Sequence, residues 1–460
     1  MADDTTMESV AASAAVVPRE PELFGHPRGL YYLAFTEAWE RFSFYGMMAL
    51  VVLYMVNQLL LPGHAEHVAG LAALRTALES VTGPMSPQAF ASQIFGLYTG
   101  FVYFTPLLGG ALADRWIGQR NAVVIGALSM AAGHIAMALD KTFLLALLLL
   151  VVGSGFLKGN IAAQVGALYP SDDEARRTRG FMIFSTGINV GAVIGPLLCG
   201  LLAQVYGWHY GFGIAAIFML LGLATYLHGY RYLPAKVERP RHEATKLTSS
   251  DWRVVLALLA VMAITIFQSI SYYQFFNVMP VWIQQHVAPS VGDFGIPVPW
   301  YQSITALFSI LGVPLLFWIW RWQASHDREP DDLAKIGIGA WLASASNLLL
   351  VAAIFVSRGA QIHPIWPILS ALGLGIAFLY YWPTLLALVS QAAPPLVNAT
   401  LMGIAYLSLG ISNIWIGWIG SLYERMGPAS FWAMHAAIAA LGGLSVVVFG
   451  SRLSRALQAA

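Results

Sequence analysis

The sequence predicts an all-α polytopic membrane protein with about 12 transmembrane helices in two six-helix halves. The chain has 460 residues, of which 58% are hydrophobic and only 10% are charged, and its mean hydropathy is +0.66. Soluble domains carry roughly 25% charged residues, so this chain cannot cover a water-facing surface. Apolar stretches of about 20 residues, the length that a membrane helix needs, recur along the sequence, and a polar linker divides them near the midpoint.

The apolar stretches define the spans in order. They lie at approximately 29–59, 89–113, 121–140, 142–169, 179–206, 209–233, 252–285, 300–323, 335–357, 362–391, 397–422 and 429–451. We therefore expect an N-terminal tail (1–28), a first six-helix bundle (29–233), a linker (234–251) and a second bundle (252–455). Two six-span halves are typical of transporters built from repeats.

The acidic N-terminal tail lacks the basic start and apolar core of a cleaved signal, so we expect the first span to remain as an anchor. Eighteen of the 24 Lys and Arg residues fall in segments that are cytoplasmic if the N-terminus is inside, and only Arg75, Lys141, Arg358 and Arg425 fall in outer segments. The positive-inside rule then places both termini in the cytoplasm. We expect the membrane to be an inner (plasma) membrane of the bacterial type.

The outer segment 62–88 has apolar residues at helical spacing between Ala65 and Glu79. This pattern predicts an amphipathic helix that caps the outer mouth. A solvated loop with one or two helical turns is the alternative.

Four charged residues lie inside apolar spans: Glu37, Glu40 and Arg41 in the first, and Lys158 in the fourth. Each costs roughly 2.5–3.5 kcal/mol to insert, so such charges mark an ion or substrate path. Glu37 and Arg41 are four residues apart, with Glu40 between them, so the three share one helix face. Two carboxylates and two bases balance to zero, so the set can neutralise itself by pairing. It can carry protons, or it can be a permanent salt bridge that locks the helices.

Other polar residues add to this path. Asp114, Arg115 and Arg120 fall at a short cytoplasmic turn, where ion pairs can form and break as the inner mouth opens, although a simple solvated turn is the alternative. Asn189 lies between glycines in the fifth span and needs a hydrogen-bond partner, either another helix or a substrate.

Aromatic residues with polar tips are concentrated in the seventh and tenth spans. They are Tyr272 and Tyr273 beside Gln268, Gln274 and Asn277, and Tyr380, Tyr381 and Trp382 before Pro383. Such side chains suit a cavity for small amphipathic molecules, and they also suit an interfacial belt. The positions in mid-span favour the cavity.

Nothing in the chain indicates an enzyme, a metal site or a cofactor other than a proton gradient. The single cysteine, Cys199, excludes a disulfide framework and a thiolate cluster. His134, His228 and His435 are scattered and lack metal-ligand spacing. The net charge of +1 gives no reason to expect a nucleic-acid partner.

Four motifs resemble those of the proton-dependent oligopeptide transporter (POT) family of the major facilitator superfamily. They are Glu37-x-x-Glu40-Arg41-Phe42 followed by Tyr45-Gly46, Tyr103 with Asp114-Arg115, Gly155-Phe-Leu-Lys158-x-Asn160, and Phe184-x-x-x-Ile188-Asn189-x-Gly191. The resemblance implies the major facilitator fold and alternating access, with 12 spans and no extra helix pair.

The resemblance also implies roles for residues. Glu37, Glu40 and Lys158 would couple protons, and Arg41 and Lys158 would receive a peptide carboxylate. Tyr45, Tyr103 and Asn189 would line the site.

The second half departs from the family pattern. Tyr273 precedes Gln274 where an acidic residue is usual, Thr305 stands at an asparagine position, and no glutamate precedes Pro383. That glutamate would hold a peptide's amino group. Without it, the amine would contact Tyr273, Tyr380, Tyr381 or Trp382 through cation–π or hydrogen-bond interactions.

We therefore predict a proton-coupled symporter that imports di- or tripeptides. The alternative within transport is a proton-coupled importer of another anionic solute or a modified peptide. A transport-dead sensor or scaffold is a second alternative, against which the intact charges of the first half argue. The expected partners are the substrate, protons and the lipid bilayer, and we expect a monomer.

Overall fold

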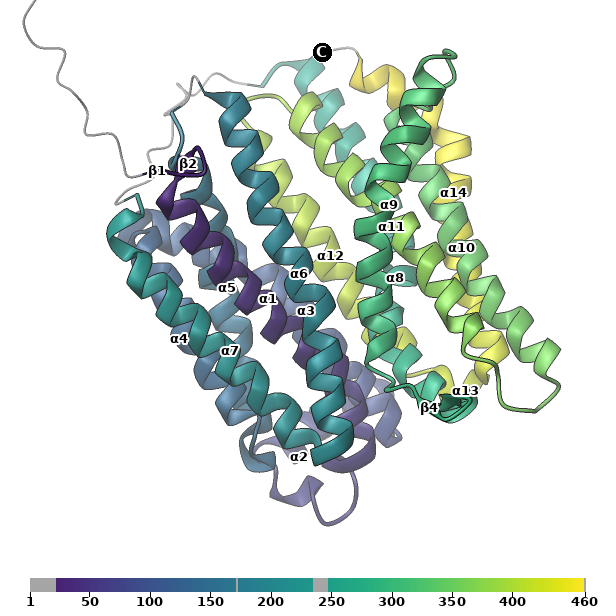
Figure 1. Ribbon diagram of the computed structural model, residues 1–460. Coiled ribbons are helices and arrows are strands. Elements are labelled where there is room, and N and C mark those ends of the chain that lie inside the picture. Colours follow the sequence, from purple (N-terminus) through teal and green to yellow (C-terminus); the bar gives the residue numbers. More distant parts are fainter. Residues whose placement is uncertain (1–21, 171–172, 235–246, 459–460) are drawn as a thin grey trace, which may run out of the picture.

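The computed structural model describes residues 22–170, 173–234 and 247–458, and these are almost entirely helical (Figure 1). The first half contains α1 (Arg28–Tyr54), α2 (Leu71–Thr82), α3 (Pro87–Leu112), α4 (Gln119–Ala136), α5 (Phe143–Ala167), α6 (Glu174–Tyr206) and α7 (Trp208–Gly229). The second half contains α8 (Ser249–His286), α9 (Trp300–Ala324), α10 (Asp332–Ser357), α11 (Ile365–Ala392), α12 (Asn398–Gly420), α13 (Tyr423–Met426) and α14 (Pro428–Leu457).

Short elements complete the described chain. They are the π-helical turns η1 (Met55–Leu59) and η3 (Ala113–Ile117), the 3-10 turns η2 (Ala65–His67), η4 (Asp140–Thr142) and η5 (Tyr230–Tyr232), and two antiparallel hairpins formed by β1 (Glu22–Leu23) with β2 (His26–Pro27) and by β3 (Ser290–Val291) with β4 (Phe294–Gly295).

Eleven of the described helices are long and apolar enough to cross a membrane. Among the described helices of 18 residues or more, only α4 is outside this set. Its first turn, Gln119-Arg120-Asn121, is polar. It lies between α3 and α5 in the chain and packs along α5 and α7. The all-α polytopic fold predicted from the sequence is therefore confirmed, and the chain is a multi-pass membrane protein. The tail (1–21) and most of the linker (235–246) lie outside the described residues.

Helix starts are set by the sequence. Thr248 and Asp251 form a reciprocal capping box at the start of α8, and the side chains of Ser86, Asp173 and Asp331 accept the free backbone N–H groups that begin α3, α6 and α10. In the segment 62–88, α2 has 12 residues and is largely exposed. The segment thus contains a helix of more than three turns, where the loop alternative expected only one or two turns. That this helix caps the outer mouth stays a prediction.

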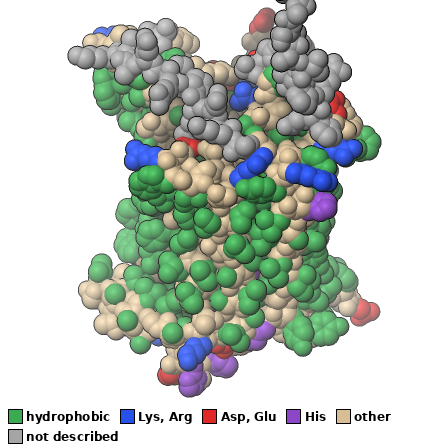
Figure 2. Space-filling model, turned by 90° about the vertical axis from the view of Figure 1, so that its left-hand side faces the viewer, with side chains coloured by type: hydrophobic (Ala, Val, Ile, Leu, Met, Phe, Trp, Pro, Cys, Tyr) green, Lys and Arg blue, Asp and Glu red, His purple; other side chains and the backbone are tan. Residues whose placement is uncertain are grey.

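The two ends of the bundle are distinct in Figure 1. We call the end that carries the β1–β2 hairpin and the last turn of α14 the terminal face, and the end that carries α2 and α13 the α2 face. Between them, Figure 2 shows a broad band of hydrophobic side chains, with most of the visible Lys and Arg side chains above it, toward the terminal face. The band is the surface that lipid covers.

The two halves meet along α3 with α12 and α6 with α9. At the α2 face they are joined by hydrogen bonds from Asn57 to Gln284 (2.9 Å) and from Arg425 to the carbonyl of Pro84 (3.1 Å). Deeper in the bundle, Ser303 donates to the carbonyl of Val193 (2.7 Å). The structure is therefore closed at the α2 face.

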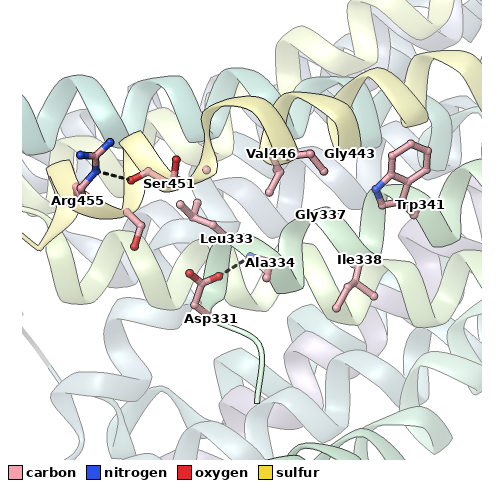
Figure 3. A pocket seen from close by; sticks show the side chains of 13 residues that line it. Asp331, Leu333, Ala334, Gly337, Ile338, Trp341, Gly443, Val446, Ser451 and Arg455 are labelled. Carbon is pink, nitrogen blue, oxygen red and sulfur yellow. Dashed lines mark hydrogen bonds between the residues drawn. The ribbon is translucent and has the colours of Figure 1, made fainter. Parts of the chain in front are cut away.

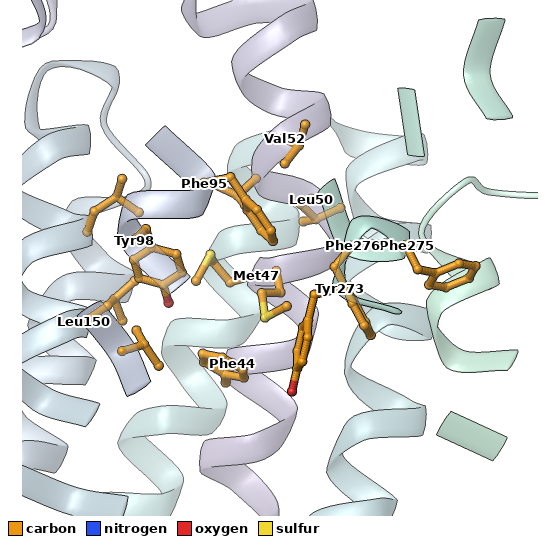
Figure 4. Packing of buried hydrophobic residues seen from close by; sticks show 14 of the residues in the cluster. Phe44, Met47, Leu50, Val52, Phe95, Tyr98, Leu150, Tyr273, Phe275 and Phe276 are labelled. Carbon is orange, nitrogen blue, oxygen red and sulfur yellow. The ribbon is translucent and has the colours of Figure 1, made fainter. Parts of the chain in front are cut away.

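The interior of the bundle is packed by apolar and aromatic side chains from both halves. Figure 4 shows Phe44 and Met47 of α1 between Tyr98 of α3 and Tyr273 of α8. Lipid chains are as apolar as these side chains, so burial alone does not hold membrane helices together and close packing does.

Candidate functional site

The charge cluster of α1 is buried in the middle of the first half. Arg41 Nε lies 3.0 Å from Glu37 Oε1, and Arg41 is also in direct contact with the Glu40 carboxylate. Glu37 is 4% exposed, Glu40 is 0% exposed and Arg41 is 7% exposed. One guanidinium thus neutralises two carboxylates in part, and the local charge of the three groups, when ionised, is negative.

Lys158 of α5 has aromatic neighbours. Its ammonium lies 4.4 Å from the ring centre of Phe44 and 5.3 Å from that of Tyr103. Within the described residues, no carboxylate oxygen comes within 4.0 Å of this ammonium. Cation–π contacts of this kind are worth about 0.5–2 kcal/mol, so they hold the ammonium only loosely and leave it available to an anion.

Two of the three glycines around Lys158 set the position of α5. A Cβ on Gly155 would lie 2.7 Å from Thr105 Cβ in α3, and a Cβ on Gly153 would lie 2.7 Å from the carbonyl of Gly126 in α4. A Cβ on Gly159 would meet nothing within 4 Å. Close helix approach therefore accounts for Gly153 and Gly155.

The helix that carries Asn189 is fixed in the same way. Gly187, Gly191 and Gly195 recur every four residues along α6 and lie against the backbone of α1. A Cβ on Gly191 would lie 2.7 Å from the backbone nitrogen of Phe42. Only glycine allows this approach, which places Asn189 beside the face of α1 that carries Tyr45.

A central cavity of about 100 Å³ lies between the halves, next to Lys158. Its wall consists of Phe44, Tyr45, Met48, Tyr103, Ile188, Asn189, Ala192, Pro196, Tyr272, Tyr273, Phe276, Gln302, Ala306, Ser309 and Phe378. The hydroxyls of Tyr103 and Tyr273 are 3.1 Å apart and bridge the two halves.

A larger vestibule of about 680 Å³ extends from the bridge to the terminal face. It shares Tyr103 with the central cavity and is lined by α3, α5 and α12, from Gly159 and Asn160 to Asp114, Arg115 and Thr400. The structure is thus open toward the terminal face and closed toward the α2 face.

The structure places four of the expected substrate-binding residues on the cavity wall: Tyr45, Tyr103, Asn189 and Tyr273. Gln274, next to Tyr273, points around α8 toward α12, where a Cβ on Gly420 would lie 3.0 Å from its Nε2. Successive residues on a helix point about 100° apart, and Tyr272 and Tyr273 occupy the face of α8 toward the cavity, so Gln274 lies on the side toward α12.

The three α11 aromatic residues that the sequence suggested for the cavity, Tyr380, Tyr381 and Trp382, do not line it. The ring of Tyr380 packs 5.6 Å from that of Trp320, the hydroxyl of Tyr381 accepts a hydrogen bond from Ser269, and Trp382 packs 5.3 Å from Tyr406. These residues serve packing between α11 and its neighbours in this conformation. Phe378, two residues earlier than Tyr380, is the α11 aromatic on the cavity wall.

The expected gating residues are spread over the terminal face. Asp114 and Arg115 lie in the π-helical turn η3 on the vestibule wall, where Asp114 accepts a hydrogen bond from Gln119 (2.8 Å). Arg120 lies 4.9 Å from the ring centre of Tyr230, in the same half. π-Helical turns are frequent at functional sites.

Sequence reasoning did not select Gln302, Ser309 or Phe276, which the structure places on the wall. Gln302 could have been found, since it is a polar side chain in the first turn of an apolar span. Phe276 carries no such signal.

A second hollow, of about 730 Å³, lies between α10 and α14 and is lined by Leu333, Trp341, Val446 and Arg455 among others (Figure 3). It contains none of the expected site residues. Within the described residues, no group of three His, Cys, Asp or Glu side chains could hold a metal ion.

The chain is similar to known transporters. The model of the Major Facilitator Superfamily matches residues 33–417. The peptide transporter YePEPT of Yersinia enterocolitica is 30% identical over 86% of this chain and 88% of its own length, and a di-/tripeptide transporter of Lactococcus lactis subsp. cremoris is 27% identical over 93% and 96%.

The fold has close counterparts among solved structures. A crystal structure of a POT peptide transporter in complex with alafosfalin is 26% identical, covers 95% of this chain and 97% of its own, and superposes with a TM-score of 0.84. A crystal structure of a POT peptide transporter in complex with sulfate superposes with a TM-score of 0.83 at 25% identity. The chain therefore belongs to the POT family of the major facilitator superfamily and is a membrane transporter, not an enzyme.

Proposed function

We propose that this protein is a proton-coupled symporter that imports di- and tripeptides or related carboxylate-bearing solutes by alternating access. Relatives that match nearly the whole chain are named peptide transporters. The observation that carries the proposal is the arrangement of the buried charges. Arg41 is engaged by two carboxylates, whereas Lys158 faces aromatic rings beside the cavity and is available for an anion.

Charge balance gives the reason for coupling. When all are ionised, Glu37, Glu40, Arg41 and Lys158 carry no net charge. A substrate carboxylate that binds Lys158 brings one negative charge into a region where uncompensated charge is costly. A proton on Glu37 or Glu40 removes that charge, and it also weakens the hold on Arg41, which can then turn toward the substrate carboxylate.

The same cycle explains release. With the terminal face open, the proton leaves through the vestibule, the carboxylate of α1 pairs with Arg41 again, and the substrate loses one of its two cationic partners. The structure, with its Arg41 pairs formed and its vestibule open, has the arrangement expected after release.

The orientation follows from the basic residues. Of the described Lys and Arg residues outside the spans, Arg75, Lys141, Arg358 and Arg425 lie near the α2 face, and the others lie toward the terminal face. We propose that the terminal face is cytoplasmic, in an inner (plasma) membrane of the bacterial type, so that the structure is open inward. Asp114, Arg115 and Arg120 would then take part in closing the inner mouth.

The proposal is tested in proteoliposomes with a labelled dipeptide and an inward proton gradient. Lys158→Ala should reduce uptake to the level of empty vesicles, because the substrate carboxylate loses its free cation. Lys141→Ala removes an exposed lysine and serves as the control, with uptake unchanged. Equal uptake by wild-type and Lys158→Ala protein would contradict this mechanism.

A further inference from the structure

We propose that the central cavity selects carboxylates whose far end is a neutral amide, such as N-acylated or N-formylated peptides, over peptides with a free amino group. The inference rests on the proposed function, since it assumes that Lys158 and Arg41 receive the carboxylate. It concerns the other end of the substrate.

The second half offers no anion to an ammonium group. Its acidic residues between 249 and 460 all lie at helix ends or in connections, and they are Asp251, Asp293, Asp327, Glu329, Asp331, Asp332 and Glu424. None of them lines the central cavity. The nearest carboxylates, Glu37 and Glu40, are held by Arg41, so a substrate ammonium would be buried without a partner of opposite charge.

The cavity does offer an amide. Gln302 of α9 lies on its wall and is 3% exposed, and neither its side-chain oxygen nor its nitrogen has a hydrogen-bond partner among the described residues. A buried amide without partners is unstable, so such a group indicates a ligand that completes it. A carboxamide has one acceptor and one donor group and is satisfied by another amide, which presents both.

The other residues that the second half contributes to the cavity wall are uncharged, and most are aromatic. The ring of Tyr272 stacks 5.0 Å from that of Phe378, and Tyr273 already uses its hydroxyl in the bridge to Tyr103. Phe276 completes this side of the wall. Aromatic faces accommodate an acyl group without loss, whereas cation–π contacts replace only part of the hydration of an ammonium.

The charge balance of transport agrees with this choice. A carboxylate with a neutral far end and one proton together carry no net charge, and the four buried charges already sum to zero. A zwitterionic peptide with one proton carries a net positive charge into the same cavity. The two substrate classes therefore differ in their response to a membrane potential.

The test is competition against a labelled dipeptide in proteoliposomes that contain the full chain. Three competitors are compared: alanylphenylalanine, its N-acetyl derivative and its C-terminal amide. We expect the N-acetyl peptide to inhibit at least as strongly as the free peptide and its uptake to be insensitive to an imposed potential. A free peptide that inhibits more than about tenfold better would overturn the inference. Equal inhibition by the C-terminal amide would instead overturn the proposed function.

Variants of Gln302 test whether this residue determines the preference between N-acetyl and free-amine peptides. Gln302→Glu supplies the missing anion, so the preference should shift toward the free amine by about tenfold, as expected when a neutral partner becomes a charged one. Gln302→Leu should weaken inhibition by the N-acetyl peptide by a similar factor. Uptake of the N-acetyl peptide should stay insensitive to an imposed membrane potential. Gln361→Glu, in the exposed connection before α11, is the matched control. Unchanged preference in both Gln302 variants, with thermal stability retained, would contradict the role of Gln302.

Discussion

Arg41 pairs with two carboxylates of its own helix, while Lys158 of α5 lies over the rings of Phe44 and Tyr103. The two cations of the site therefore differ in what they can do. Lys158 is available to an anion in this conformation, and Arg41 becomes available only when a carboxylate releases it. This difference between the two side chains is the basis of the proposed coupling.

Arg41→Lys tests the requirement for a guanidinium. A lysine ammonium is a point charge and cannot hold two carboxylates in the fork geometry of arginine. We expect uptake driven by a proton gradient to fall by more than about tenfold, since a loss of about 1.4 kcal/mol already gives a factor of ten. Initial rates of labelled dipeptide uptake measure this change, and rates within twofold of wild type would contradict it.

At the residue scale, the charged residues of the candidate site are easier to select from the sequence than the neutral ones. A charged residue inside an apolar span is recognised directly from the sequence, and Glu37, Glu40, Arg41 and Lys158 were selected in this way. The choice among Gln274, Tyr380 and Tyr381 depends on how α8 and α11 are rotated about their axes. Rotation is set by packing against neighbours, which a single span does not reveal.

Glycines fix the helices on which the site depends. Gly187, Gly191 and Gly195 lie against α1, and Gly155 lies against α3, so each helix is held where its functional side chain meets the others. The glycines around Lys158 were recognised in the sequence. The four-residue repeat in α6 is equally visible there, but its partner helix could not be predicted.

Two adjacent glycines of α3 provide a matched comparison. A Cβ on Gly109 would collide with the backbone of α5 at Gly155 and lie 2.9 Å from the nitrogen of Phe156, whereas a Cβ on Gly110 would meet nothing within 4 Å. Gly109→Ala should destabilise the protein by about 1–3 kcal/mol through overpacking. Gly110→Ala should have little effect. Thermal unfolding in detergent measures both, and equal melting temperatures would contradict the packing.

The β1–β2 hairpin should loosen as pH falls. The ring of His26 is buried, its Nδ1 is 2.8 Å from the Tyr169 hydroxyl, and burial lowers the pKa of His26 below its usual 6.5, with Arg176 and Arg179 adding to the effect. Because the neutral ring is the favoured form in the folded state, the stabilisation is complete above pH 6.5 and is lost as pH falls below it.

Amide hydrogen exchange of residues 22–27, corrected for the intrinsic pH dependence, measures this loosening. Protection should decrease between pH 7 and 5 in the wild-type protein and stay constant in His26→Phe. A pH-independent protection in the wild-type protein would contradict the role of His26.

The whole molecule is closed at the α2 face and open at the terminal face, with the bridge between Tyr103 and Tyr273 at the bottom of the vestibule. Two six-span halves and a polar linker between them are predictions from hydropathy and charge, which can be read along the sequence. The sequence cannot predict which face is open, since the conformations open at the α2 face and at the terminal face have the same spans. The contacts of Asn57 with Gln284 and of Ser303 with Val193 join the two halves on the closed side of the molecule.

A short cross-link at the α2 face should arrest transport. In the double variant Asn57→Cys and Gln284→Cys, the two side chains face one another across the halves, and the native Cys199 is buried and should not react. A bifunctional maleimide should abolish uptake, because the α2 face can no longer open. Each single variant treated in the same way is the control, and full uptake by the cross-linked protein would contradict alternating access.

The central claim is that the buried carboxylates of α1 carry the proton. Its most direct test compares two assays of Glu40→Gln in proteoliposomes: counterflow, in which labelled substrate exchanges at equal concentration without net proton movement, and accumulation driven by an inward proton gradient. The account predicts that counterflow persists while accumulation is lost, since the neutral amide keeps the cavity but cannot exchange a proton. Accumulation at the wild-type level by both Glu40→Gln and Glu37→Gln would contradict it.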